Sequence, residues 1–411
     1  MGMSSKQKQI PAVRFNGFTE AWEQRKLGEV GELNRGKSKH RPRNDAKLFG
    51  GSYPFIQTGD VAKAGLYLTN YGQTYSDFGI QQSKLWNEGT LLITIAANIA
   101  ETSILGIKAA FPDSVIAFES DDVDMVFVKN VIDKISDMLK RTAETSSQAN
   151  LNLAKLSELK IDLPSIGEQI KIGAFFKQLD DTIALHQRQL NNYKQQKKYM
   201  LQKMFPKDGE KVPEVRFDGF TEEWEQCNLG DVAMIKTGYP FNSEDFDGSG
   251  KYLVITNGNI QNDLAFVDNS LGNRIDVSDT VLLNNYELNI GDVLVTMDGT
   301  VGRTAKVICS NQIIAQRVGR LIAKDNSEFL YQSLNTGDFS KEMKKVSHGG
   351  TIKHISLTEI SDYAMFVPAT VEEQTKIGAF FKHLDDATDH HQQKVNGYQQ
   401  LKNAMLQQMF V

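Results

Sequence analysis

Apolar residues follow a heptad rhythm in two long segments of this chain, residues 166–205 and residues 371–411. In each segment they recur at alternating steps of four and three, the spacing of a helix that packs along one seam. At a rise of about 1.5 Å per residue, each helix would be roughly 50 Å long. The shared spacing predicts that the two helices pair antiparallel as a coiled-coil-like spacer, in preference to lying as separate surface helices. The seam positions are Leu179, Ile183, His186, Leu190, Tyr193, Lys197, Met200 and Met204, then Leu384, Thr388, His391, Val395, Tyr398, Lys402, Met405 and Met409.

The segments between the helices have a different pattern, with short apolar runs bounded by Gly, Asn and Asp, which predicts strands. Near the end of each segment, residues 131–144 and 327–335 have a helical pattern. Each segment is therefore predicted to be a mixed α/β domain. The runs predicted as strands are YPFIQT (53–58), TLLITIA (90–96), KYLVIT (251–256) and DVLVTM (292–297).

Two stretches of sequence each occur twice in the chain with few differences, which indicates an internal repeat. Glu168 and Glu373, at the start of the second pair of passages, follow Ser165 and Thr370 by three residues, which is the pattern of a capping box at a helix start. Trp22 and Trp224, in the first pair, are predicted to be packing anchors. The repeated passages are RFNGFTEAWEQ (14–24) with RFDGFTEEWEQ (216–226), and EQIKIGAFFKQLDD (168–181) with EQTKIGAFFKHLDD (373–386).

These patterns predict an α/β (α+β) protein with a pseudo-two-fold internal repeat. Its two mixed α/β domains are separated by two long antiparallel helices. The expected order is a first domain, a central spacer helix, a second domain and a C-terminal spacer helix, at residues 1–165, 166–205, 206–370 and 371–411.

Composition indicates an ordinary globular protein, with 40% hydrophobic and 24% charged residues and no apolar run long enough to span a membrane. The two cysteines form no CxxC pair, so we expect a reduced, cytoplasmic protein. The net charge of −5 hides an uneven distribution. Counts of basic and acidic residues give +1 (20 and 19) for 1–165, +4 (7 and 3) for 166–205, −9 (15 and 24) for 206–370 and −1 (4 and 5) for 371–411.

The chain has no motif that is typical of a catalytic or cofactor site. Searches for a GxxxxGK[ST] loop, a GxGxxG turn, GxSxG, HExxH and an EF-hand pattern find nothing. The Asn/Asp-Pro-Pro-aromatic signature of amino-methyltransferases is also missing, since the chain has no Pro-Pro. None of the seven histidines is paired with Cys or Glu at a metal-binding spacing. We therefore expect a non-catalytic chain with no metal or cofactor of its own.

The strongest binding signal is a basic loop at residues 34–47, NRGKSKHRPRNDAK, with one acidic residue, Asp45. Gly36, Ser38 and Pro42 indicate a loop. Such a density of positive charge suits a nucleic-acid backbone, where counterion release supplies affinity. A merely solvated loop remains the alternative. The cations of the loop are Arg35, Lys37, Lys39, Arg41, Arg43 and Lys47.

In the second half the corresponding stretch, KTGYPFNSEDF (236–246), is far less basic, and VSHGGTIKHIS (346–356) is the better candidate. Its glycines can expose backbone N–H groups to a phosphate. An ordinary strand–turn–helix junction is an equally good interpretation of this stretch. The residues predicted to contact DNA in this half are Lys236, Tyr239, Arg303, Arg317, His348, Gly349, Gly350, Thr351, Lys353 and His354.

Several short motifs give the chain a family resemblance. A strand followed by Gly59–Asp60 or Gly258–Asn259, and EQ-x-K-I before each long helix, occur in both halves. The second half adds GTVGRTA (299–305), IIAQRVGRL (313–321) and GGTIKHISLTEI (349–360), where the first half has NIAETSILG and SSQANLNLAKL. In this duplicated order the chain resembles the DNA specificity (S) subunit of type I restriction–modification systems.

The resemblance implies two target-recognition domains, each reading one half of a split, asymmetric sequence in double-stranded DNA. The helices would act as a ruler and as the docking platform for two methyltransferase (M) subunits. Restriction (R) subunits would complete the complex, and S-adenosylmethionine, ATP and Mg would belong to these partner subunits. The residues assigned to the spacer and to methyltransferase docking are Phe175, Phe176, Leu179, Leu190, Tyr193, Phe380, Phe381, Leu384, Val395 and Tyr398.

Two other functions remain open at this point. One is a stand-alone bipartite DNA-binding protein without enzyme partners. The other is a duplicated scaffold that binds protein or glycan, which the charge of −9 in residues 206–370 favours.

Overall fold

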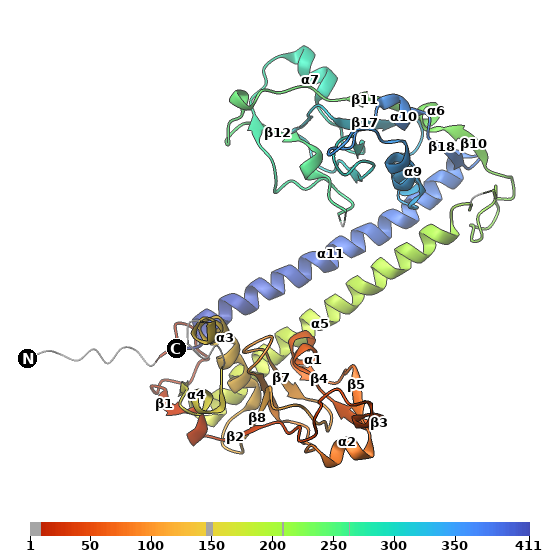
Figure 1. Cartoon of the computed structure of the whole chain (residues 1–411). Helices are drawn as coiled ribbons and strands as arrows, with labels where there is room; N and C mark the ends of the chain where they lie inside the picture. Colours follow the sequence, from red (N-terminus) through yellow and green to blue (C-terminus); the bar gives the residue numbers. More distant parts are fainter. Residues whose placement is uncertain (1–9, 145–150, 208, 263) are drawn as a thin grey trace, which may run out of the picture. The chain divides into compact units, whose positions relative to one another are not determined.

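The computed structural model describes residues 10–144, 151–207, 209–262 and 264–411. Part of the first-half motif SSQANLNLAKL, residues 146–150, lies outside this description. The chain divides into two compact units, Met1–Arg188 with Gln392–Val411 as unit 1, and Gln189–His391 as unit 2. Two long helices, α5 (Ile166–Lys203) and α11 (Val371–Met409), contribute to both units (Figure 1). The division into four segments stays a prediction, but both spacer helices are present.

Unit 1 is built around a five-stranded sheet with the order β2-β8-β6-β7-β4. The pairs β1–β9 and β3–β5 are separate. The strands are β1 Glu23–Lys26, β2 Glu32–Arg35, β3 Phe49–Phe55, β4 Tyr67–Leu68, β5 Gln73–Tyr75, β6 Leu91–Thr94, β7 Thr102–Leu105, β8 Val115–Glu119 and β9 Lys160–Leu163. The helices are α1 Thr58–Lys63, α2 Asp77–Gln81, α3 Met125–Glu144 and α4 Leu153–Ser157, with short 3-10 turns at Leu27–Glu29 and Ala46–Leu48.

Unit 2 contains a four-stranded sheet, β11-β17-β14-β15, a three-stranded sheet, β13-β12-β16, and the pair β10–β18. The strands are β10 Glu225–Asn228, β11 Ala233–Thr237, β12 Tyr252–Ile255, β13 Arg274–Ile275, β14 Val293–Thr296, β15 Thr304–Lys306, β16 Gln312–Ile314, β17 Val318–Ala323 and β18 Ala364–Val367. The helices are α6 Leu229–Val232, α7 Thr280–Tyr286, α8 Ser327–Leu334, α9 Asp338–Val346 and α10 Leu357–Ser361, with 3-10 turns at Ser243–Asp245 and Asn257–Asn259.

The central strands are buried on both faces, which explains why their sequences are continuous apolar runs. In β6, Leu91 and Ile93 join the core that contains α3 and the long helices, while Leu92 joins a second cluster on the opposite face. In β14, Val293 and Leu294 divide in the same way. The runs at 53–58, 90–96, 251–256 and 292–297 all overlap strands, and the two helical patterns lie in α3 and α8. The mixed α/β prediction is confirmed.

The long helices run antiparallel within each unit, and the heptad seam is confirmed. In unit 1, Lys402 Nζ of α11 lies 2.7 Å from Asp180 of α5, and the ring of Tyr398 stacks on His186. In unit 2, the equivalent lysine, Lys197, is paired with Asp385, and Tyr193 stacks on His391. The seam histidines therefore serve in packing. Because the same two contacts recur, each unit sets the helix register by itself.

The repeated passages meet in space through a buried ion pair. Arg14 donates to both carboxylate oxygens of Glu168 at 2.7 and 2.8 Å, and Arg216 donates to Glu373 at 2.6 and 2.8 Å. Both glutamates are buried, at 0% and 1% exposure. The capping-box prediction is confirmed only in part: the Thr370 hydroxyl accepts the N–H of Glu373 at 3.3 Å, but both carboxylates bind arginines. The hydrogen bond from Arg14 to Glu168 also raises the pKa of the arginine.

Residues 13–24 and 215–226, termed the clasps, each join the start of one long helix to the end of the other. In the first clasp, Phe15 packs edge-on against Phe175 near the start of α5, and Trp22 packs against Phe410 after α11. The second clasp repeats these contacts, Phe217 with Phe380 and Trp224 with Phe205. The backbone N–H of Val13 donates to Gln408 at 2.9 Å, and that of Val215 donates to Lys203 at 2.8 Å. Trp22 and Trp224 are almost fully buried, so their anchoring role is confirmed.

Replacing Arg14 with Ala should lower the free energy of unfolding of unit 1 by about 3–5 kcal/mol, because Glu168 would remain as a buried, unpaired charge. Chemical denaturation followed by tryptophan fluorescence measures this loss. Arg25→Ala is the matched control, since Arg25 pairs with Glu29 only at the surface and should cost less than about 1 kcal/mol. The double replacement Arg14→Met with Glu168→Met should recover most of the loss. A loss as small as that of the control would contradict a stabilising role for the buried pair.

Candidate nucleic-acid interface

One edge of the main sheet is built alike in both units. In unit 1, β8 is antiparallel to both β2 and β6, so β2 and β6 end where β8 begins. In unit 2, β17 is antiparallel to both β11 and β14 in the same way. We call this side of each sheet the loop edge. The basic loop leaves the loop edge of unit 1 directly after β2.

The turn that follows β6 has the same hydrogen bonds as the turn that follows β14, although the sequences differ. The Thr94 hydroxyl accepts the N–H of Glu101 at 3.0 Å, and the Thr296 hydroxyl accepts the N–H of Arg303 at 3.0 Å. The N–H of residue 100 donates to Thr94 O and that of Gly302 to Thr296 O, both at 2.9 Å. NIAETSILG therefore folds as GTVGRTA does.

This turn needs a left-handed backbone at two positions. Gly299 and Gly302 adopt φ values of 69° and 77° in unit 2. In unit 1 the same places hold Ala97 and Ala100, at 44° and 61°. A residue with Cβ is strained there, so the turn of unit 1 is the less stable of the two.

The basic loop is held by bonds within itself and to the segments beside it. His40 lies 2.9 Å from Asp45, and the guanidinium of Arg41 donates to the carbonyl oxygens of Ser38 and His40. The N–H of Lys47, and then His40, lower the pKa of the Asp45 carboxyl. One ion pair reaches out of the loop: Arg43 donates to Asp113 at 2.5 Å, just before β8.

Four cations of the basic loop are exposed, and their side chains make no hydrogen bond or ion pair with the residues that the structure describes. They are available to an anionic partner at the loop edge. These four are Arg35, Lys37, Lys39 and Lys47.

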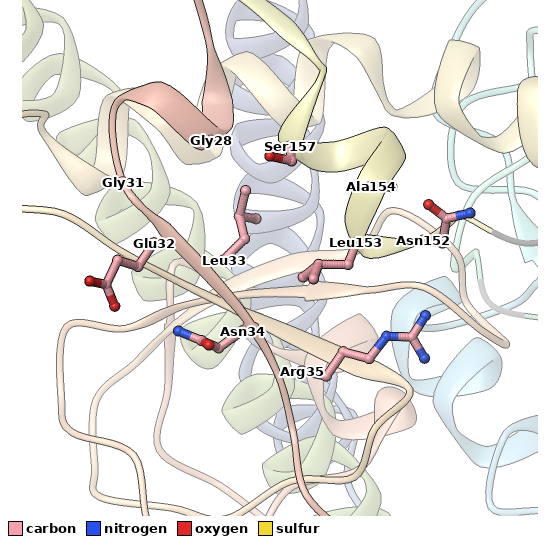
Figure 2. A pocket seen from close by; sticks show the side chains of 10 residues that line it. All are labelled: Gly28, Gly31, Glu32, Leu33, Asn34, Arg35, Asn152, Leu153, Ala154 and Ser157. Atoms are coloured by element: carbon pink, nitrogen blue, oxygen red, sulfur yellow. The ribbon is translucent and has the colours of Figure 1, made fainter.

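An open groove of 760 Å³ lies between β2 and α4 beside this loop (Figure 2). Leu33 and Leu153 line it, and the Arg35 side chain extends from β2 on the side where Asn152 lies. A related groove of 370 Å³ lies between β11 and α10 in unit 2. In unit 1, a Cβ at Gly28 would lie 2.1 Å from the Ser157 hydroxyl, so a larger residue would force Ser157 to shift, and Gly230 approaches Ser361 in the same way in unit 2. The groove thus belongs to the shared frame.

Asp298 is the centre of the loop edge in unit 2. Its two carboxylate oxygens lie 2.8 Å from the Arg317 guanidinium and 2.6 Å from His354 Nδ1. The N–H of Gly299 donates to Lys353 O at 2.8 Å, which ties the same segments together through the backbone. The motifs GTVGRTA, IIAQRVGRL and GGTIKHISLTEI therefore converge here.

The other residues predicted in the second half are distributed around this centre. Lys236 is exposed at the end of β11, and the ring of Tyr239 packs on Phe241 and Tyr286. Arg303 is half-buried and donates to Ile260 O at 3.4 Å. The predicted residues His348, Gly349, Gly350, Thr351 and Lys353 are exposed in the turn between α9 and α10, as is Ile352 between them.

Sequence reasoning missed two aspartates that hold arginines at the loop edges, Asp113 and Asp298. Asp113 is 70 residues from Arg43 in sequence, and Asp298 is 19 from Arg317. Neither pair is close enough in sequence to belong to a helical or strand repeat, so no local pattern links the two residues. The only available signal was that Asp298 directly precedes GTVGRTA.

The residues assigned to the spacer and to docking pack inside the chain. Tyr193, Tyr398, Phe175 and Phe380 are partly buried. This burial suits the spacer role, so a partner subunit would have to contact other, exposed residues of α5 and α11. The nearly fully buried members are Phe176, Leu179, Leu190, Phe381, Leu384 and Val395.

Over the described ranges, no three His, Cys, Asp or Glu side chains gather as metal ligands, and no helix is long and apolar enough to cross a membrane.

The family model of the type I restriction modification DNA specificity domain matches the chain twice, at residues 19–195 and 221–397. The chain belongs to this family. Two specificity domains make it a DNA-recognition protein and not an enzyme. Each domain match contains one sheet with its loop edge and the larger part of one long helix.

Two known proteins extend the comparison. The type I restriction enzyme MjaVIII specificity subunit of Methanocaldococcus jannaschii is 23% identical over 389 residues, which are 89% of this chain and 87% of that relative. The crystal structure of a type I restriction-modification system S subunit from M. genitalium matches with a TM-score of 0.71 and 14% identity. It covers 98% of this chain and 99% of that chain, and the likeness is one of fold.

Exchanging alanine and glycine at the first left-handed position of the turn after β6 and of the turn after β14 should change the stability of the two units in opposite directions. Ala97→Gly should stabilise unit 1 by about 1 kcal/mol, because it removes the strain of a left-handed alanine. Gly299→Ala should destabilise unit 2 by a similar amount, since its Cβ would meet open space and only strain would be added. Thermal unfolding measures both. Changes of the same sign in the two variants would contradict a shared turn.

Replacing Arg35, Lys37, Lys39 and Lys47 with Gln should weaken binding of specific and random DNA alike, because phosphate contacts position a protein without specifying a sequence. The slope of log affinity against log salt should decrease by about 0.9 for each phosphate that the variant no longer neutralises. Titration of labelled duplexes at several salt concentrations measures this slope. Arg25→Gln, on β1 and away from the loop edge, should leave the slope unchanged. An unchanged slope in the fourfold variant would leave the loop merely solvated.

Proposed function

We propose that this chain is the DNA-reading subunit of a type I restriction–modification complex. Each unit reads one half of a split, asymmetric target in double-stranded DNA, and the long helices set the distance between the halves. The helices also dock two methyltransferase subunits, and restriction subunits join the full complex.

The observation that best supports this proposal is that the two units share a backbone arrangement at the loop edge but carry different side chains there. The strand order and turn at the loop edge are alike in the two units. The side chains that occupy this edge differ: a basic loop in unit 1, and the cluster around Asp298 in unit 2. A protein that recognises two different half-sequences needs one scaffold with two sets of contacts.

Electrostatics supports binding of a polyanion by unit 1. The four exposed cations of the basic loop lie on one short segment, residues 35–47, which begins at the loop edge and can meet phosphates. The acidic balance of residues 206–370 does not oppose binding by unit 2, because local charge decides contact. There, Arg317, Lys353 and His348 are exposed together near the loop edge.

The chemistry of the complex belongs to its partners under this proposal. S-adenosylmethionine would be held by the methyltransferase subunits, and ATP and Mg by partner subunits. This chain would work in the cytoplasm, where cellular DNA is modified. Its contribution is the sequence, the spacing and the orientation of the target.

Two alternatives make different predictions. A stand-alone DNA-binding protein would not bring a methyltransferase with it on purification from its native host. A protein- or glycan-binding scaffold would show no salt-dependent retention on heparin. The observation that favours a scaffold is the charge of −9 over residues 206–370.

The proposal is tested by expressing the chain with its methyltransferase and sequencing the methylated sites of the host DNA. We expect one split motif. Replacing residues 25–165 with those of a family relative should change one half of that motif and preserve the other. The reciprocal exchange, within residues 227–370, is the matched control and should change the opposite half. If either exchange changes both halves together, the units do not read independently.

A further inference from the structure

Each loop edge presents one arginine that is anchored by an aspartate. In unit 1, Arg43 donates to Asp113 at 2.5 Å, with half of the arginine side chain exposed. In unit 2, Arg317 donates to Asp298 at 2.8 Å, and 61% of its side chain is exposed. A phosphate can be bound by an arginine that is free to move, so phosphate binding does not explain why these two arginines are held by aspartates.

The anchor of Arg317 is fixed from several directions. Asp298 also lies 2.6 Å from His354 Nδ1, so its carboxylate is held on both sides. The N–H of Met297 donates to Arg317 O at 3.1 Å, and the N–H of Ile355 donates to Met297 O at 2.9 Å. These bonds join the segments that carry the carboxylate, the guanidinium and the imidazole. The carboxylate that anchors Arg317 is therefore fixed in place, and the guanidinium is held to it by one hydrogen bond.

The backbone of Arg317 is itself unusual, with φ at +73°. A residue with a Cβ rarely adopts this conformation, and such positions gather at binding sites. Arg317 is the third residue of the tight turn Ala315–Val318, which the N–H of Val318 closes on Ala315 O at 3.4 Å, and such a turn accounts for the positive φ. The turn places Arg317 between β16 and β17, where its side chain is mostly exposed and reaches Asp298.

Arginine carries five N–H donors in a planar fork. The bond from Arg317 to Asp298 uses one terminal nitrogen, Nη1, which leaves donors that can point outward. Two parallel donors match O6 and N7 of guanine in the major groove, the commonest specific contact between an arginine and a base. An arginine that a carboxylate already holds loses less side-chain entropy when it binds a base. Its fixed orientation also favours the base whose acceptors match its donors.

Comparison of the two units shows that their anchored arginines arise at different places. Matching backbone hydrogen bonds identify the residue of unit 1 that is equivalent to Arg317. In unit 2 the N–H of Met297 donates to Arg317 O, and in unit 1 the N–H of Ile95 donates to Ser114 O. Unit 1 thus has a serine at this position. Its anchored arginine comes from the basic loop, held by Asp113 just before β8. Two guanidinium groups at different points of one frame would select guanines at different positions of two half-targets.

We propose that Arg43 and Arg317 each read a guanine, one in each half-target, and that Asp113 and Asp298 are positioning residues for them. This inference rests on the proposed function and adds to it the residues and the base. The unanchored cations of the basic loop remain phosphate contacts.

The test uses the full chain in complex with its methyltransferase subunits. Arg317→Lys keeps the positive charge but loses the fork. Methylated-site sequencing and competition between duplexes should show a roughly 5- to 150-fold loss of discrimination at one G·C pair of one half-target. The other half-target should be unchanged. Arg43→Lys should do the same in the opposite half-target.

Two further variants separate base reading from other roles. Asp298→Asn removes the anchoring charge, and should relax selection at the same base pair as Arg317→Lys without changing the salt dependence of binding. Lys37→Gln, a matched exposed cation, should weaken all duplexes alike and reduce the salt slope. Thermal unfolding of each variant shows whether the fold is intact.

The inference is overturned if Arg317→Lys and Arg43→Lys weaken every duplex equally, since these arginines would then contact phosphates. It is also overturned if both leave every base preference unchanged, or if the relaxed base pair is not guanine-containing. Failure of the proposed function is a distinct outcome, because the unmodified complex would then methylate no split sequence at all.

Discussion

Two buried arginine–glutamate pairs determine how this chain is assembled. Arg14 and Arg216 each bind a glutamate in the first turn of a long helix, more than 150 residues further along the chain. The phenylalanines and tryptophans of the clasps then pack against the start of that helix and the end of the other. A buried charge without its partner would be strongly unfavourable. Each ion pair therefore requires the clasp and the start of one helix to be together, and the tryptophan of the clasp adds the end of the other helix.

The helices carry a second constraint, which concerns their register. Lys402–Asp180 in one unit and Lys197–Asp385 in the other are the same contact repeated. A heptad seam alone permits a shift by whole repeats. A partly buried charge pair at one defined position opposes such a shift, because every other register would separate a lysine from its aspartate. The register of the two long helices is thus specified by few residues, while the loop edges are free to diverge.

Much of the fold could be predicted from the sequence because its signals are local. The heptad seam, the strand runs such as those of β6 and β14 and the helices α3 and α8 depend on neighbouring residues. The clasps could be recognised as repeats but not placed, since Arg14 and Glu168 have no sequence signal that links them. The candidate site was found only in part. Its cations are conspicuous in composition, whereas Asp113 and Asp298 act through distant contacts, and the shared turn is hidden because Ala97 replaces a glycine.

The division of the chain also has a consequence for its biosynthesis. Unit 2 is one continuous stretch, Gln189–His391, whereas unit 1 needs Gln392–Val411 as well as Met1–Arg188. During synthesis on the ribosome, unit 1 therefore cannot be completed until the C-terminal half of α11 emerges. Until then, Trp22 has no contact with Phe410, and the N–H of Val13 has no bond to Gln408. The domain synthesised later can finish first, which reverses the usual N-to-C order. During that interval the apolar side chains that the end of α11 covers in the finished unit, such as Trp22, remain uncovered.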